Sequence, residues 1–276
     1  MVIDKCLLLK CSIITESLVI GIITVSSRAA LSLPAPCNMS LKGGLFCCAD
    51  PAVWREVFQK YWNVVELKSS VKGKNQGKLL PLERWYQEEL PQTIAARSER
   101  FLEHQELVKV MEWKLTRGKF RPRLQQLVAT NPSETVETCT RRAFGLLPDV
   151  QAAITELSTL KALGPATASA VLAAGAPDRA AFMADEAVQS IPGLTPIQYT
   201  MKHYAVYLQE MTERARTLNQ ADSSQEWTPH LVERCLWTWA VAEKLQPSLL
   251  DGIAAGEKGG GESERSGRAT KRQKTK

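Results

Sequence analysis

The sequence is poor in residues that bind metal ions. It contains three histidines, and none of its cysteines forms a C-x-x-C pair. Zinc sites need Cys and His at short, fixed spacings, so neither a zinc site nor any cofactor is predicted. The seven cysteines are Cys6, Cys11, Cys37, Cys47, Cys48, Cys139 and Cys235. Only the last two lie beyond residue 50, which favours buried thiols in a reducing compartment over a disulfide framework.

The sequence also lacks a hydrophobic run long enough to cross a bilayer. The most apolar stretch, Ser17–Ser27, is too short, because a transmembrane helix needs about 20 residues. A secretory signal is an alternative for this stretch, but Glu16 and Arg28 flank it closely. We therefore interpret residues 1–50 as a poorly ordered extension, with Met39 as an alternative initiation site, and predict no membrane partner.

The body of the chain has no excess of positive charge. The net charge is +6, but the segment RSGRATKRQKTK at the C-terminus carries six Lys or Arg and no acid. Removing it leaves 29 basic and 29 acidic residues, so local clusters must decide any affinity for nucleic acid. We predict that residues 252–276 form a disordered basic tail, whose KRQKTK end indicates a nuclear location.

Alternating apolar and polar residues, the mark of a half-buried strand, are absent. Apolar residues instead recur at helical spacing, so residues 51–251 are predicted to form one all-α domain. Asn131 is predicted to cap a helix that begins near Pro132 and stops at Gly145. Further helices are expected over about 196–218 and 229–245, with a helix break near Leu90–Pro91.

One stretch of small residues, LSTLKALGPATASAVLAAG (Leu157–Gly175), contains Gly-Pro where a helix would otherwise continue. We expect a helix over 149–160, a turn over 161–164, and a second helix over 165–174 with Pro165 at its first position. A turn and helix start of this kind present backbone N–H groups that attract an anion, above all a phosphate. The alternative is that the small residues only allow two helices to pack closely.

The pattern L-x-x-L-x-x-L-G-P-A-T-A-S-A-x-L, followed by Asp185 at the start of a helix, resembles the helix–hairpin–helix DNA glycosylases of base-excision repair. The resemblance covers about residues 157–191 and implies an all-α fold that grips duplex DNA through the hairpin. It implies that Asp185, 19 residues after Ala166, is the catalytic carboxylate. The residues expected to hold phosphate are Lys161, Leu163, Gly164, Ala166 and Thr167.

The sequence departs from the family pattern at two hairpin positions. Ala162 replaces the first hairpin glycine and costs about 1 kcal/mol if this position requires a positive φ. Ala166 replaces the Schiff-base lysine of the bifunctional members, so strand cleavage through a covalent imine is not expected. The cysteines of the iron–sulfur branch are also absent after Ile191, where only Cys235 remains.

Asp185 suits the chemistry of base removal, because a carboxylate beneath the sugar stabilises the cation that develops as the base departs. Its alternative role is that of a helix N-cap, a position that Asp strongly favours. Glu186 is a poor substitute because it lies within the following helix. The aromatic residues available to receive an extruded base are Trp113, Tyr199, Tyr204 and Trp227.

The segment WKLTRGKFRPR (Trp113–Arg123) holds five cations and no acid. It is predicted either to follow a phosphate backbone or to form a solvated helix end. Its cations are Lys114, Arg117, Lys119, Arg121 and Arg123. Together these features indicate a DNA-binding protein, either a monofunctional glycosylase or a catalytically silent module that binds DNA or protein.

Overall fold

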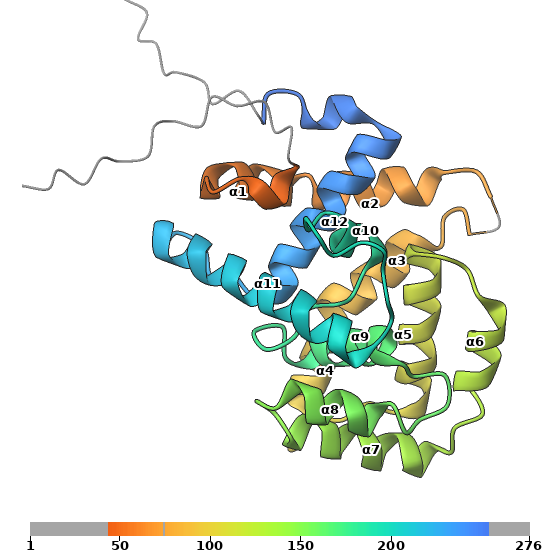
Figure 1. The fold of residues 1–276 in the computed structure, drawn as a ribbon. Coiled ribbons are helices and arrows are strands. Elements are labelled where there is room, and N and C mark those ends of the chain that lie inside the picture. The colour runs from red at the N-terminus through yellow and green to blue at the C-terminus, as the bar shows by residue number, and fades with distance from the viewer. Residues whose placement is uncertain (1–43, 74, 254–276) are drawn as a thin grey trace, which may run out of the picture. The chain divides into compact units, whose positions relative to one another are not determined.

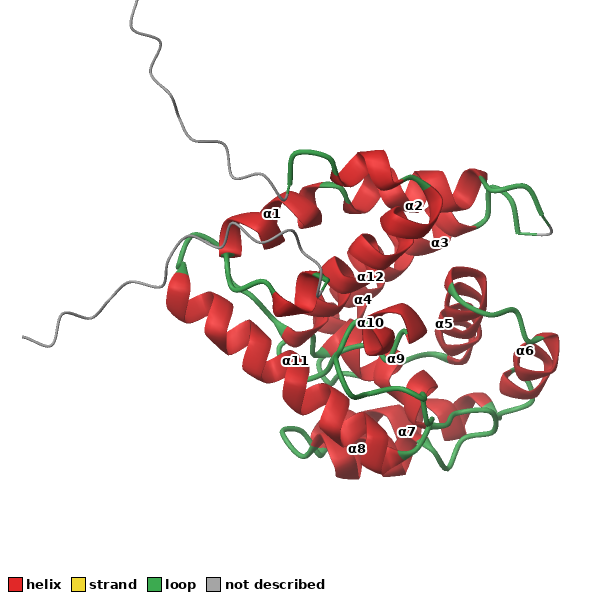
Figure 2. Cartoon of the chain, turned by 45° about the horizontal axis from the view of Figure 1, so that its top comes forward, coloured by secondary structure: helices red, strands yellow, loops and turns green. Residues whose placement is uncertain are grey.

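The computed structural model describes residues 44–73 and 75–253, and in these residues every regular element is a helix or a helical turn. Figure 1 shows the arrangement of the helices, and Figure 2 shows that no strand is present in this described part. The predicted all-α class is therefore confirmed. The helices are α1 (Pro51–Gln59), α2 (Tyr61–Ser70), α3 (Leu79–Arg84), α4 (Leu90–Ala96), α5 (His104–Arg117), α6 (Pro122–Val128), α7 (Ser133–Gly145), α8 (Val150–Leu157), α9 (Pro165–Gly175), α10 (Asp185–Gln189), α11 (Met201–Ala221) and α12 (Pro229–Leu245).

The packed part of the chain is longer than predicted at both ends. Leu45 and Phe46, which lie before α1, are buried in the core, and so is Ile253, which lies beyond the predicted start of the tail. These apolar side chains are removed from water by contact with the helices. The predictions for residues 1–43 and 254–276 fall outside the described residues.

Helix α9 lies at the centre of the described part, packed against α4, α5, α8 and α11. All its residues from Ala166 to Ala174 are buried, and short side chains let the neighbouring helices approach closely. At its end Gly175 faces Phe144, where an added Cβ would lie 2.6 Å from the ring. The small residues therefore serve close packing along the body of α9 and leave its N-terminal end for another role.

Three predicted helix boundaries are wrong. Helix α8 ends at Leu157 and not at Leu160, because Thr159 N–H and Leu160 N–H bond to the carbonyl groups three residues earlier. The chain stays helical through Pro91, because the π-helical turn η2 (Trp85–Glu89) shifts the hydrogen bonds so that Leu90 N–H bonds to Trp85 O. Proline lacks an N–H, so it is tolerated where the regular pattern is already interrupted. The start of α11 is Met201 rather than a residue near 196, since the Thr200 hydroxyl caps it by accepting from His203 N–H.

Candidate nucleic-acid-binding pocket

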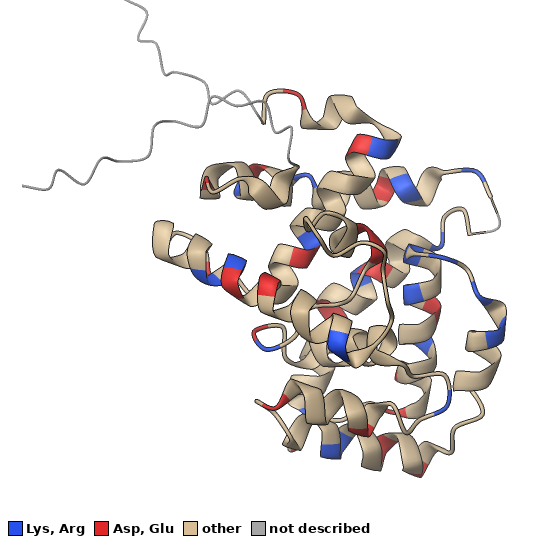
Figure 3. Ribbon diagram, viewed as in Figure 1, with Lys and Arg blue, Asp and Glu red and all other residues tan. Residues whose placement is uncertain are grey.

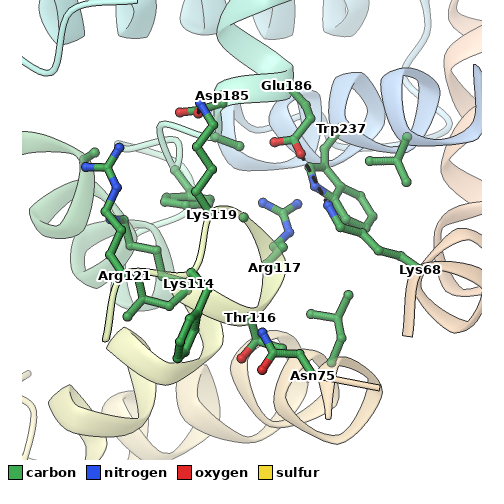
Figure 4. Close-up of a pocket in the computed structure, with 18 of the residues that line it drawn as sticks. Lys68, Asn75, Lys114, Thr116, Arg117, Lys119, Arg121, Asp185, Glu186 and Trp237 are labelled. Carbon is green, nitrogen blue, oxygen red and sulfur yellow. Dashed lines mark hydrogen bonds and ion pairs between the residues drawn. The ribbon is translucent and has the colours of Figure 1, made fainter. Parts of the chain in front are cut away.

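A pocket of about 840 Å³ opens where five segments meet, and we call it the hairpin pocket. It is lined by the end of α5 and the loop that follows, the N-terminal end of α9, the start of α10, one face of α12, and the loop after α2. Figure 4 shows its labelled side chains. The predicted hairpin, the predicted catalytic Asp185 and the predicted basic segment, which are far apart in the sequence, all contribute to this one pocket.

The turn between α8 and α9 has the strained conformation that its sequence suggested. Ala162 has φ 69°, and among the described residues it is the one non-glycine with a positive φ. This is the position of the missing hairpin glycine, and the left-handed region is costly for a residue with a Cβ. The turn therefore holds an alanine in the left-handed conformation that glycine favours.

Replacing Ala162 with glycine is expected to raise the free energy of unfolding by up to about 1 kcal/mol, because it removes the strained Cβ. Urea denaturation monitored by circular dichroism measures this change. The matched control is Ala152→Gly in α8, where glycine in a regular helix is expected to lower stability by about 1 kcal/mol. A lower stability for Ala162→Gly would show that the positive φ carries no strain.

Only some of the hairpin amides that are expected to hold phosphate are free of hydrogen bonds within the protein. Lys161 N–H donates to Asn131 Oδ1 at 2.8 Å, Leu163 N–H donates to Leu160 O, and Thr167 N–H donates to Gly164 O. Within the described residues, no hydrogen bond occupies the N–H of Gly164 or of Ala166. The amide contribution of Lys161, Leu163 and Thr167 was therefore predicted wrongly. Of the five amides predicted to hold phosphate, those of Gly164 and Ala166 are left for an anion.

Asn131 does not cap a helix as predicted but holds the hairpin turn through its side chain. Its side chain donates to Lys161 O at 3.1 Å and accepts from Lys161 N–H, so it clamps the hairpin turn. Helix α7 starts at Ser133 without a side-chain cap. Asn side chains bond backbone groups across loops as readily as at helix ends, and local sequence does not distinguish the two.

Asp185 is the first residue of α10, but its carboxylate caps nothing, and the N-cap position belongs to Ala184. Instead Oδ1 accepts from Tyr199 OH at 2.7 Å, and Oδ2 lies 2.9 Å from Lys119 Nζ. The side chain is 23% exposed, so it is reachable from the pocket. The hydrogen bond and ion pair that Lys119 makes with Asp185 raise the pKa of Lys119. The N-cap alternative for Asp185 is thus wrong, and the carboxylate already holds a cation in the pocket.

The extended segment that carries Asp185 is fixed by buried hydrogen bonds. Met183 N–H donates to Ser169 Oγ at 3.0 Å, so this small residue of α9 also anchors the neighbouring segment. Tyr207 OH donates to Phe182 O, and Tyr204 OH donates to Ala181 O. Burial of these groups makes each bond costly to break, which holds the backbone before Asp185 in place.

The five cations of the basic segment lie in three different environments. Lys114, Lys119 and Arg121 line the hairpin pocket, and Arg121 also lies over the Tyr199 ring at 5.7 Å. Arg123 is exposed on α6 outside the pocket. Arg117 was predicted wrongly as a phosphate contact, because its side chain is 1% exposed.

Arg117 lines the pocket, but its charge belongs to a buried ionic cluster. Its Nη1 donates to Glu233 Oε1 at 2.7 Å, and its Nε lies 3.6 Å from Glu83 Oε2. Its guanidinium stacks over Trp237 at 4.3 Å from the ring centre. Buried charges need such partners, so this arginine is required by the fold and not free for DNA.

The aromatic residues of the pocket differ from most of those predicted. Tyr199 lines it as expected. Trp113, Tyr204 and Trp227 are buried in the core instead. Phe182 and Trp237 form part of the pocket wall and were missed, but both are also core residues, 5% and 0% exposed. Phe120 also lines the pocket and is 47% exposed.

The lining of the pocket carries more positive than negative charge. Glu186, one of its two acids, lies 3.3 Å from Lys68, whose pKa is lowered by burial. Figure 3 shows the basic residues on the loop after α5 and on the loop after α2. A positive, hollow surface of this kind attracts a polyanion. The charged residues that line it are Lys68, Lys72, Lys114, Arg117, Lys119, Arg121 and Lys244, with Asp185 and Glu186.

The described residues contain no cluster of His, Cys, Asp and Glu suited to a metal ion, and Cys47, Cys139 and Cys235 are free thiols. None of the helices described is both long and apolar enough to span a bilayer. No family model, curated protein or solved structure matches the chain.

Proposed function

We propose that this chain is a nuclear DNA-binding protein of helix–hairpin–helix type that hydrolyses the N-glycosidic bond of a damaged or mispaired base. One observation carries the proposal. The two unbonded amides of Gly164 and Ala166 and the carboxylate of Asp185, which caps no helix, lie in the same positively charged pocket. The amides suit a backbone phosphate, and the carboxylate suits the sugar cation.

The dimensions of the pocket suit an extruded nucleotide. Its volume of about 840 Å³ lies within the usual range for ligand sites, roughly 300–1,000 Å³. Tyr199, which lines the pocket and is 41% exposed, offers an aromatic ring to a base that has left the stack. Phe120 also lines the pocket and is 47% exposed, and an exposed aromatic ring of this kind can stack on a base.

The second candidate is a catalytically silent module that binds DNA or protein with the same surface. The ion pair between Lys119 and Asp185 favours it, because a neutralised carboxylate is a weaker stabiliser of a cation. However, Lys119 is 68% exposed and belongs to a loop, so an entering nucleotide can displace it at little cost.

Incubation with a panel of duplexes separates the two candidates. The duplexes carry uracil, alkylated purines, oxidised guanine or mismatches, and alkali then reveals abasic sites as strand breaks. Base release from at least one duplex is the expected result. If the protein binds duplexes but releases no base from any of them, the catalytically silent module is the correct candidate. If it neither binds nor releases a base, DNA binding itself is overturned.

Replacing Gly164 with leucine tests the hairpin directly. Gly164 has an extended backbone (φ −91°), and an added Cβ meets no atom within 4 Å, so the fold is expected to remain unchanged. The new side chain stands beside the two free amides and blocks a phosphate. Duplex affinity is expected to fall about 10- to 100-fold, the value of one or two charge-assisted hydrogen bonds.

Fluorescence anisotropy with a labelled duplex at several salt concentrations measures this loss. The matched control is Gly145→Leu at the end of α7, which also has open space around its Cβ and lies outside the pocket. It is expected to bind DNA as the wild type does. Equal affinities for both variants would exclude the hairpin as the phosphate contact.

A further inference from the structure

Two buried atoms of α12 face each other without a hydrogen bond. Glu233 Oε2 and His230 Nδ1 lie 3.7 Å apart, and neither bonds to any residue that the structure describes. The two side chains are 0% and 8% exposed, so bulk water does not satisfy them. Buried polar atoms are rarely left unsatisfied, and this pair therefore needs a physical explanation.

The hydrogen bonds around His230 determine which of its nitrogens carries a proton. Gln87 Nε2 donates to Tyr61 OH at 3.1 Å and to Glu83 Oε1 at 3.0 Å, so the amide oxygen of Gln87 is left to accept. This oxygen lies 3.1 Å from His230 Nε2, which is therefore the N–H donor. In a neutral ring Nδ1 is then an acceptor. Two acceptors face each other, and a single proton between them satisfies both.

Glu233 is the acid of this buried cluster that lacks donors. Its Oε1 accepts from Arg117 Nη1 at 2.7 Å, whereas Glu83 accepts from three side chains. Burial raises the pKa of Glu233 to about 7, and the charge of Glu83 adds to this shift. Arg117 and Arg234 oppose it. Glu233 therefore exchanges a proton in the neutral range.

The other titratable groups around Glu233 do not change charge with it. Burial lowers the pKa of His230 well below its usual value, so the ring stays neutral. On α2 and α10, which also pack against α12, Lys68 and Glu186 pair with each other. Four further groups stay neutral because burial raises their pKa: Tyr61, Tyr86, Tyr207 and Cys235.

Arg117 connects the cluster to the hairpin pocket, because it lines the pocket and donates to Glu233. With Glu233 protonated, the charges of Arg117 and Glu83 balance. With Glu233 ionised, the cluster gains a negative charge beside a pocket that suits a polyanion, and a buried charge is weakly screened.

We propose that Glu233 holds a proton on Oε2 and donates it to His230 Nδ1, and that loss of this proton as the pH rises weakens the binding of duplex DNA in the hairpin pocket. The inference rests on the proposed function, because it concerns the regulation of that same site.

Nuclear magnetic resonance of the full chain without DNA tests the proton. The Glu233 carboxyl carbon, assigned by its loss in Glu233→Gln, and the His230 ring nitrogens are followed between about pH 5 and 9. We expect the carboxyl to titrate near pH 7, while His230 keeps its Nε2–H form and Nδ1 loses a hydrogen bond. A carboxyl that is ionised throughout, or a His230 ring that becomes doubly protonated in its place, would overturn the assignment.

Duplex affinity, measured by fluorescence anisotropy, tests the regulation. Glu233→Gln imitates the protonated acid, since its amide can accept from Arg117 and donate to His230 Nδ1. Burial lowers the pKa of Lys114, which also lines the pocket, to about 8, so every protein compared carries Lys114→Arg to keep that charge constant. With Lys114→Arg alone, affinity is expected to fall about 3- to 10-fold between about pH 6 and 8, the usual effect of one partly screened charge. With Glu233→Gln added, it is expected to stay constant.

Glu243→Gln is the matched control, because it removes an exposed carboxylate of α12 outside the pocket and is expected to leave the pH dependence unchanged. Thermal unfolding shows that each variant is folded. Duplex binding that falls equally with and without Glu233→Gln would overturn the regulation and leave the proposed function intact. Absence of duplex binding at every pH would overturn the proposed function and the regulation together, and the magnetic resonance titration would still decide whether Glu233 holds the proton.

Discussion

Replacing Asp185 with asparagine is expected to slow base release by about 10²- to 10⁴-fold, the usual contribution of a positioned carboxylate in acid–base and electrostatic catalysis. The amide keeps the volume of the side chain and can still accept from Tyr199 OH. It loses the negative charge that stabilises the sugar cation. Single-turnover release from the best substrate of the duplex panel measures the effect.

The fold is expected to tolerate this change. Asp185 caps no helix, and the ion pair that it loses involves Lys119, which is largely exposed and screened by solvent. Thermal stability and duplex affinity are therefore expected to stay near the wild-type values. A variant that releases bases normally would remove Asp185 from the chemistry. A variant that unfolds would assign it a structural role instead.

Glu186→Gln is the matched control, because Glu186 is the next residue and lines the same pocket. Its carboxylate is engaged by Lys68 at 3.3 Å and not by the loop that carries Lys119. Base release is expected to stay within about threefold of the wild type, as is usual for changes outside the reacting groups. Equal losses in the two variants would mean that the general charge of the pocket, and not one carboxylate, matters.

Replacing Arg117 with methionine is expected to lower the free energy of unfolding by about 3–5 kcal/mol, the usual cost of removing one partner from a buried ion pair. The change leaves the Glu233 carboxylate buried without its cation. Glu83 suffers less, because it also accepts from Trp113 Nε1 at 2.9 Å, from Gln87 Nε2 at 3.0 Å and from Tyr61 OH. Urea denaturation measures the loss, and Arg121→Met, an exposed arginine of the same segment, is expected to cost less than about 0.5 kcal/mol.

The loss of stability caused by Arg117→Met is expected to grow as the pH rises above 7. Burial raises the pKa of Glu233 to about 7 even though Arg117 opposes the shift. A carboxyl whose pKa is raised on folding stabilises the fold when protonated and loses this contribution as the pH passes through the folded-state value. Without Arg117 the pKa of Glu233 rises further, so the variant keeps losing stability at a pH where the wild type has stopped. Burial lowers the pKa of His230, which lies near Glu233, so it stays neutral in this range.

The double variant Arg117→Met, Glu233→Leu separates ion pairing from packing. With the orphaned carboxylate removed, it is expected to be more stable than Arg117→Met alone. If the stability losses of Arg117→Met and Glu233→Leu simply add in the double variant, the arginine acts through its contact with Trp237 and not through its charge.

The sequence by itself determined the helical class, the turn before Pro165 and the position of Asp185 at a helix start. These features depend on residues within one or two helical turns, such as Gly-Pro, a run of small side chains and a periodic apolar stripe. The resemblance raised a positive φ at position 162 as a condition, because the resembled pattern has glycine there, and the structure has that φ at Ala162.

Only the tertiary structure decided which groups are free to act. Arg117 looked like its basic neighbours, yet it is buried by Glu233, which lies 116 residues away. Asn131 looked like a helix cap but clamps a turn 30 residues later. Lys114 looked like any surface lysine, until distant segments enclosed it in the hairpin pocket. Local pattern fixes backbone conformation, whereas burial and pairing depend on partners that the fold brings from far along the chain, and these set the charge and reactivity of each side chain.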